Sequence, residues 1–269
     1  MLLRRITKHV SDQNWFAVFI DFLIVVVGVF IGIQIGDWNN DRLKSERTEV
    51  LYERLADDFG VDVWLAEHFS SYNKDVIKNA KLVLDDLTKR QLLDDNKLLI
   101  AAFRATQFNR MQKSSTYKEL VSTGGYDLLA KSKLGRIATV FYENETANEI
   151  QSDGQYSDYR SMYRTLVPID VQLHIATACG DRDFSIERLM NIESVLSYEC
   201  ELSLTENQIS EAAFLLRGDP ELAKNLRRRI ANLSMQNIDF GTLLEAIKPY
   251  RASKEVMSNA GVFMIYKED

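Results

Sequence analysis

The sequence predicts an all-α protein, with one transmembrane helix near its N-terminus that extends into a helical stalk, followed by a soluble helical-bundle domain. Three observations support this fold class. The 269 residues include only 12 Gly and 3 Pro, too few turn-forming residues for an all-β fold. Apolar residues make up 46% of the chain, which is enough for a sizeable core. One long apolar run lies close to the N-terminus.

The apolar run covers residues 15–35 and is long enough to span a membrane. It carries one charge, Asp21, and one side-chain amide, Gln34, and at ~1.5 Å per residue it covers ~30 Å of hydrocarbon. A cleavable signal peptide is disfavoured because the run is too long and no small-x-small cleavage site follows it. A buried core helix is disfavoured because "LIVVVGVFIGI" is apolar on every face. We therefore predict a transmembrane helix over residues 15–36.

Residues on either side of the run predict its orientation. Three basic residues near the N-terminus place that end in the cytoplasm and the bulk of the chain outside, which is the periplasm if the membrane is a bacterial inner membrane. Residues 1–14 are expected to form an amphipathic segment at the lipid headgroups. Aromatic residues at the two ends would sit at opposite interfaces. The predicted interfacial anchors are Arg4, Arg5, Lys8, Trp15 and Trp38.

Small residues gather on one side of the predicted transmembrane helix. At ~100° per residue, one stripe contains Ala17, Asp21, Gly28, Gly32 and Gly36; we call these five residues the packing face. Small residues let helix backbones approach closely in lipid, and a carboxylate on that stripe is shielded and can bond a neighbouring helix or be protonated. The alternative is that glycine is common in such helices and that the acid reaches interfacial water. Ion conduction is disfavoured, because one Asp on one span defines no pathway.

Residues 37–59 contain no Gly or Pro and are expected to continue the helix outward as a stalk. Its first turns are polar on nearly all sides, as in a solvated helix. Leu51, Leu55 and Phe59 then begin an apolar stripe that marks entry into a domain over residues 60–269.

Apolar periodicity predicts helices over residues 73–88 and 95–108, and a long helical run over 133–177 in which Pro168 either kinks the helix or begins a new one. In "STYKELVSTGG", Thr116 and Glu119 have the spacing of a capping box, and Gly124 or Gly125 supplies a left-handed stop.

The last long helix is predicted to begin with Asp219 as N-cap and Pro220 at its first position. The closing "GVFMIY" is compatible with a strand or with a docked tail.

Charge argues against nucleic acid as a partner. Residues 1–44 contain five basic and four acidic residues, and the remainder contains 28 basic and 35 acidic residues, so the domain is acidic, whereas nucleic-acid binding requires basic surfaces. The exception is "LRRRIA" at 226–231, which we interpret as a solvated face paired with nearby acids.

No pattern indicates a metal site, a cofactor or a catalytic residue. His9, His68 and His174 lack partners at metal-ligand spacing. Nucleotide-binding loops and nucleophile elbows are absent from the sequence. Adjacent acids diverge on a helix, so solvated faces are expected for three pairs: Asp57/Asp58, Asp85/Asp86 and Asp94/Asp95.

The two cysteines, Cys179 and Cys200, are able to form a disulfide if the domain is periplasmic, closing a loop worth ~3 kcal/mol. A helix over residues 185–199 would be ~22 Å long. With a turn at "GDRDF", it would place the two cysteines at opposite ends of a hairpin. The sequence therefore favours unpaired cysteines.

Two stretches carry a resemblance to a known family: "NWFAVFIDFLIVVVGVFIGIQIGDWN" (14–39) and "TYKELVSTGGYDLLAKSKLGRIATVFYENE" (116–145). The chain resembles an uncharacterised family of Gram-negative bacterial single-pass membrane proteins with a helical domain of unknown function. The resemblance implies residence in the inner membrane and supplies no activity. Residues 150–269 take no part in it.

Three classes of function follow. The leading hypothesis is a non-enzymatic, membrane-anchored scaffold or accessory subunit of an inner-membrane assembly, whose partners are the bilayer and either itself or other subunits. The alternative is a periplasmic ligand-binding sensor, which would act through a partner because about 14 cytoplasmic residues leave no room for an output domain. A hydrolase or transferase would need converging charged residues, and the sequence indicates none.

Overall fold

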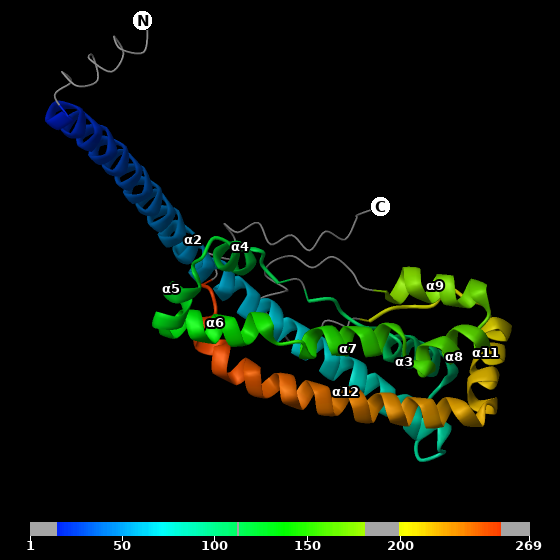
Figure 1. Cartoon of the computed structure of the whole chain (residues 1–269). Coiled ribbons are helices and arrows are strands. Elements are labelled where there is room, and N and C mark those ends of the chain that lie inside the picture. The colour runs from blue at the N-terminus through cyan, green and yellow to red at the C-terminus, as the bar shows by residue number, and fades with distance from the viewer. Residues whose placement is uncertain (1–14, 112, 181–198, 254–269) are drawn as a thin grey trace, which may run out of the picture. The chain divides into compact units, whose positions relative to one another are not determined.

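The structure is a computed structural model that describes residues 15–111, 113–180 and 199–253 (Figure 1). In these residues every regular element is a helix, which confirms the predicted all-α class. The chain divides into two compact units, Met1–Tyr52 and Glu53–Asp269. A long apolar helix thus precedes a helical domain.

Helix α2 (Trp15–Leu87) is a single 73-residue helix. Its N-terminal part is long and apolar enough to cross a membrane, and none of its most apolar stretch is buried. Leu51, Leu55 and Phe59 are all buried, as their apolar stripe predicts, and the second compact unit begins at Glu53. From Phe59 to Ser70 every residue except Leu65 is buried, so this stretch of α2 is the central helix of the domain. The helix predicted over 73–88 is the last part of α2.

At one end of the domain, α2 packs in a shared core with α3 (Asp95–Ala105), α8 (Asp158–Leu166), α9 (Ile169–Cys179) and α11 (Glu206–Gly218) (Figure 1). Apolar faces such as Leu98, Leu99 and Ala102 of α3 are fully buried there. Helix α12 (Pro220–Ile247) runs past α8, α7 (Thr146–Gln155) and α6 (Lys133–Glu143) in turn. A short 3₁₀ turn, η1 (Lys248–Tyr250), follows it.

The long helical run predicted over 133–177 is wrong, because the structure divides it into α6, α7, α8 and α9. Two of the three breaks have a clear local cause. The Ser157 hydroxyl accepts a hydrogen bond from the Arg160 N–H and so caps α8 at its start. Pro168 is the N-cap of α9, which confirms the second of its two expected roles.

Gly154 near the end of α7 is a position that only glycine fits, since an added Cβ would lie 2.5 Å from the Cβ of Phe108. The close approach lets the segment after α3 pass against α7.

Helix α4 (Thr116–Ser122) has a different start from the predicted one. Its N-cap is Ser115, whose side chain makes no capping bond, and Thr116 is the first helical residue. The Thr116 hydroxyl donates instead to the carboxylate of Asp58, so the capping box is wrong. The predicted stop is confirmed at Gly124, whose φ of 87° is left-handed. Helix α5 (Tyr126–Lys131) follows.

The predicted start of α12 is confirmed. Asp219 is the N-cap and accepts hydrogen bonds from the N–H groups of Glu221 and Leu222, with Pro220 at the first position. The closing "GVFMIY" lies outside the described residues.

Candidate functional site

The predicted packing face lies on the exposed part of α2. A Cβ added at Gly28, Gly32 or Gly36 would meet no atom within 4 Å, and Asp21 is exposed. Ala17 is part of the helix, but its side chain lies outside the described part of the structure. No other described segment covers this face, so its role in packing stays a prediction.

The predicted interfacial anchors are only partly described. Trp38 is exposed on α2, while Arg4, Arg5 and Lys8 lie outside the described residues, as does the side chain of Trp15. The large apolar side chains between the two tryptophans, such as Phe22 and Phe30, are also exposed.

A buried carboxylate marks the middle of the domain. Asp62 of α2 is 3% exposed and accepts hydrogen bonds from the Ser114 N–H (2.8 Å) and the Tyr142 hydroxyl (2.7 Å). Burial raises the pKa of Asp62 to about 6, because the loss of water outweighs these two hydrogen bonds. One turn earlier, Asp58 accepts hydrogen bonds from the hydroxyls of Ser114 and Thr116. The prediction that Asp57 and Asp58 are both solvated therefore holds only for Asp57.

Lys113 fixes the same segment from the other side. Its ammonium donates to the carbonyls of Phe141 (3.1 Å), Tyr142 (3.3 Å) and Asn144 (2.7 Å) at the end of α6. A cation is favoured at this negative end of a helix dipole. Burial lowers the pKa of Lys113. The hydrogen bonds of Asp58, Asp62 and Lys113 thus join α2, α6 and the segment before α4, so these polar side chains have a structural role.

A second buried carboxylate corrects another prediction. Asp86 has a side chain that is 0% exposed and forms a two-point ion pair with Arg217 of α11, at 2.9 and 3.1 Å. Arg217 also pairs with Asp95 at 2.6 Å, and these carboxylates raise its pKa. Asp94 is the N-cap of α3. The solvated faces expected for Asp85/Asp86 and Asp94/Asp95 are therefore wrong for Asp86, whereas the side chain of Asp95 is 36% exposed.

The histidines have separate surroundings. His68 is buried and stacked on Trp64, with ring centroids 5.9 Å apart, and burial lowers its pKa to about 4. His174 accepts a hydrogen bond from the Ser203 N–H at 3.0 Å, while His9 lies outside the described residues. Within the residues that the structure describes, no three His, Cys, Asp or Glu side chains are placed to hold a metal ion.

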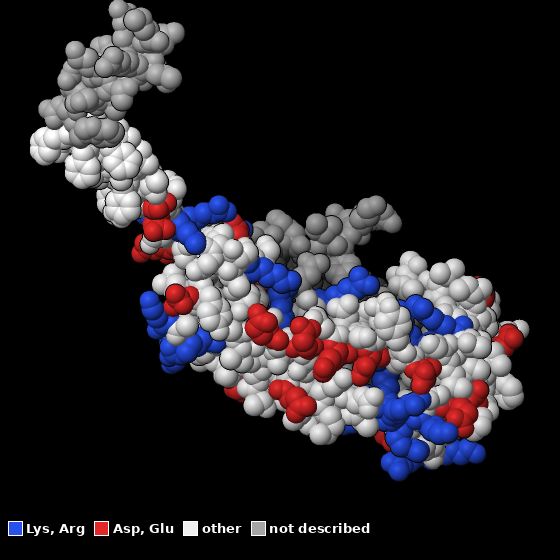
Figure 2. All heavy atoms as spheres, viewed as in Figure 1, with Lys and Arg blue, Asp and Glu red and all other residues white. Residues whose placement is uncertain are grey.

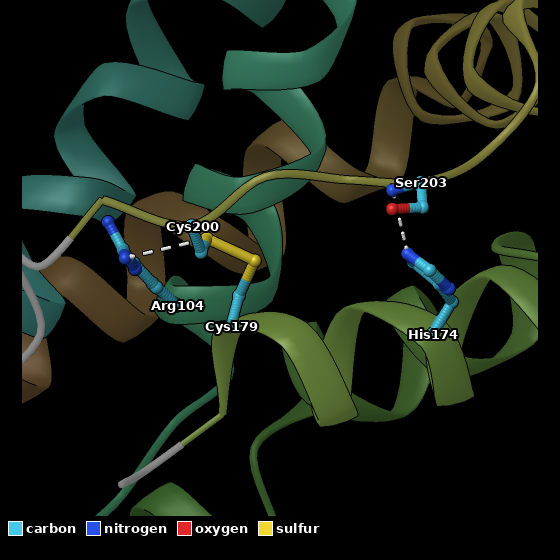
Figure 3. Close-up of a disulfide and its surroundings, with 5 residues drawn as sticks. All are labelled: Arg104, His174, Cys179, Cys200 and Ser203. Carbon is cyan, nitrogen blue, oxygen red and sulfur yellow. Dashed lines mark hydrogen bonds between the residues drawn. A yellow bond between two sulfur atoms is a disulfide. The ribbon is translucent and has the colours of Figure 1, made fainter.

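Cys179 and Cys200 form a disulfide, so the expectation of unpaired cysteines is wrong (Figure 3). Most of the helix expected over 185–199 lies outside the described residues, but residues 199–205 are not helical. They run back along α9, because the Ser203 N–H bonds His174 and Gln208 bonds Asp170 at 2.8 Å. This antiparallel path brings the two Cα atoms within 5.4 Å, inside the range for a disulfide.

The basic run "LRRRIA" divides into different roles. Arg227 is exposed, and Arg228 forms an ion pair with Asp158 of α8, as a solvated face predicts. Arg229 contradicts the prediction, because it is only 6% exposed. Its Nε and Nη2 donate to the carbonyls of Ala105 (2.7 Å) and Gln107 (2.6 Å) at the end of α3. Burial lowers its pKa to about 10, which leaves the guanidinium protonated at neutral pH.

Arg229 borders a cavity of about 270 Å³ between α7, the start of α8 and α12. We call it the α7–α12 pocket. Its charged and amide lining residues are Asp153, Asp158, Arg228, Arg229, Asn232 and Gln236. The sequence gives no sign of this pocket, because Asp158 and Arg228, which both line it, are 70 residues apart.

Comparisons with protein families, with curated proteins and with solved structures gave no match to this chain. The family resemblance of the anchor and of residues 116–145 therefore stays a prediction.

Proposed function

We propose that this chain is a non-enzymatic, membrane-anchored helical protein that associates, through the packing face of α2, with itself or with subunits of an inner-membrane assembly. The observation that carries the proposal is the N-terminal part of α2, where large apolar side chains are exposed on all sides around a stripe of small residues. Such a surface is strongly unfavourable in water and favourable in a bilayer.

The packing face gives this helix a preferred side for association. In lipid, helices gain little from burying apolar area and associate where small residues permit close backbone contact. Gly28, Gly32 and Gly36 offer space for a second helix, because a Cβ at each would meet nothing. Asp21 on the same stripe would be removed from lipid and hydrogen-bonded in such a contact.

The disulfide supports a periplasmic location for the helical domain. Disulfides form and persist in oxidising compartments and are rare in the cytosol, and Cys179 is paired with Cys200. The basic N-terminal residues favour the same orientation, with the N-terminus in the cytoplasm.

The polar side chains in the domain interior support a structural role over an enzymatic one. Asp62 accepts hydrogen bonds from a backbone N–H group and a tyrosine hydroxyl. Asp86 accepts one from a backbone N–H group and forms an ion pair with an arginine. Lys113 holds the end of a helix. These are groups that a catalytic site would use, and here they join helices.

The test is to enlarge the packing face and measure the size of the detergent-solubilised protein by light scattering. Gly32→Leu is expected to give a smaller particle, because a leucine there separates the two backbones. The matched control, Val27→Phe, adds bulk on the other side of the helix and is expected to leave the particle unchanged. If Gly32→Leu had the same mass as the wild type, the packing face would not be the contact.

A further inference from the structure

The α7–α12 pocket brings opposite charges to one small cavity. Figure 2 shows acidic side chains in a row over α7 and basic side chains gathered near the first half of α12. Exposed acids of α7 and its N-cap are Glu145, Glu149 and Asp153, and exposed basic residues in the first half of α12 include Lys224, Arg227 and Arg228. The pocket lies where the two groups meet.

Two of the four charged lining residues neutralise each other. Arg228 is paired with Asp158, which leaves Arg229 and Asp153 to act on anything that enters the cavity.

Arg229 presents a positive charge without a carboxylate partner among the described residues. Its hydrogen bonds from Nε and Nη2 go to backbone carbonyls, which carry no net charge. In the described part of the chain its Nη1 has no acceptor, and it lies beside Gly154, where a Cβ would be 3.8 Å away. Two backbone carbonyls and the charge of Asp153 offset only part of the desolvation of this cation, so an anionic partner at Nη1 is favoured.

Asp153 presents the complementary negative charge. It accepts one hydrogen bond, from Nε2 of Gln236 at 2.7 Å, and no described Lys or Arg lies within ion-pair distance of it. Oε1 of the same Gln236 is buried without a donor. The exposed carboxylate of Asp153 is therefore the acceptor that this side of the pocket offers to a ligand that donates hydrogen bonds.

We propose that the α7–α12 pocket binds a small zwitterion of the α-amino-acid type, with its carboxylate toward Nη1 of Arg229 and the Asn232 amide and its ammonium toward Asp153. A simple anion would leave the charge of Asp153 beside it without compensation, and a simple cation would do the same for Arg229. A cavity of about 270 Å³ suits a molecule of this size. The site is independent of the association proposed for α2.

The first test uses the full chain in mild detergent and measures its unfolding temperature with L-serine, L-alanine and L-glutamine, each at about 10 mM. Propionate and ethylamine at the same concentration supply the carboxylate alone and the ammonium alone. At least one of the amino acids is expected to raise the unfolding temperature. Propionate and ethylamine are expected to leave it unchanged. The proposal is overturned if no amino acid of the panel has an effect, or if propionate or ethylamine stabilises as strongly.

The second test locates the site by isothermal titration with the amino acid that stabilises most. Asp153→Asn is expected to weaken binding about 10-fold or more, the value for loss of a hydrogen bond to a charged group. Glu149→Gln removes the same charge one turn earlier on α7, outside the lining, and is expected to bind normally. On the opposite side, Asn232→Ala is expected to weaken binding and Arg227→Gln to leave it unchanged. Near-ultraviolet circular dichroism confirms that each variant folds, and equal affinities throughout would contradict the site.

Discussion

Asp85 and Asp86 are neighbours in the chain but lie in opposite environments. Asp86 is fully buried between Arg217 and the Leu93 N–H, whereas Asp85 is 40% exposed and 3.8 Å from Arg90. Successive side chains on a helix diverge by ~100°. Adjacency alone therefore predicts the divergence, but it does not predict which of the two acids faces the core.

We expect Asp86→Ala to lower the free energy of unfolding by ~2–4 kcal/mol, because it removes one partner of a largely buried ion pair. Asp85→Ala is the matched control and is expected to cost less than ~1 kcal/mol, as for a surface pair. The measurement is denaturant unfolding of the full chain in mild detergent. Equal losses of unfolding free energy in the two variants would show that the buried ion pair stabilises the fold no more than the surface pair does.

The pKa of Asp62 predicts a pH-dependent stability. Burial raises the pKa of this carboxyl from its usual 3.8 to about 6 in the folded protein, so the folded state binds the proton more tightly. The contribution of this raised pKa to the free energy of unfolding is complete below pH ~4 and is lost as the pH rises through about 6. Asp62→Asn cannot ionise and is therefore expected to exceed the wild type by ~1–3 kcal/mol above pH 6.

The measurement for Asp62→Asn is the difference in unfolding free energy from the wild type at pH 4.5 and at pH 7.5. The difference is expected to be much smaller at the lower pH. Asp57→Asn changes an exposed acid on the same helix and is expected to show no such trend. A difference for Asp62→Asn that does not vary with pH would contradict the raised pKa.

At the scale of elements, a helix end that is set by residues of its own turn is predictable from the sequence. A feature that depends on contacts between distant segments is not. The start of α12 follows from Asp219 and Pro220, whose preferences are set by the backbone of their own turn. The break before α8 also has a local cap, Ser157, but the apolar periodicity on both sides concealed it. Thr116 has the spacing of a capping box, yet its hydroxyl bonds Asp58, which is 58 residues away.

The disulfide also depends on contacts between segments that are distant in the sequence. Its formation depends on the path of residues 199–205 along α9, which is held by the His174–Ser203 and Asp170–Gln208 hydrogen bonds. A local signal was present in the capping box formed by Thr205 and Gln208, which places the start of α11 after a stretch of coil.

We expect Cys200→Ala to lower the free energy of unfolding by ~3 kcal/mol, because the disulfide closes a loop with a sequence separation of 21. Reduction of the wild type is expected to give a similar loss, and reduction of the variant none. Hydrogen exchange of residues 199–205 is expected to increase in both cases, since the return segment loses its link to α9. Unchanged stability of the reduced wild type would show that this link is dispensable.

The candidate sites differ in how far a sequence can predict them. The packing face is a property of one helix and follows from its periodicity alone. The α7–α12 pocket requires α7, α8 and α12 to meet, and Arg229 is buried there because α3 ends against it. A basic run gives no indication of such burial, so its solvated interpretation failed at one residue of the three.

The two units of the chain require different surroundings. The large apolar side chains from Phe16 to Val50 are exposed, whereas the helical domain has a buried apolar core to which α2, α3, α8, α9, α11 and α12 contribute. We expect the full chain to stay in the membrane pellet after an alkaline carbonate wash. Val26→Arg is expected to release it, because a charge at the centre of the span costs ~2.5–3.5 kcal/mol for insertion. Asn40→Arg places the same charge beyond the apolar stretch and is expected to leave the chain in the pellet.

The orientation of the chain in the membrane is tested in bacterial cells that produce it. Protease added to spheroplasts is expected to digest the helical domain, while intact cells protect it, because the outer membrane excludes the protease. The Cys179–Cys200 pair is expected to resist thiol labelling until a reductant is added, as in an oxidising compartment. A domain protected in spheroplasts, with cysteines that react at once, would place it in the cytoplasm. In that case the packing face of α2 would still be available for association, but the partner of the helical domain would have to be sought on the other side of the membrane.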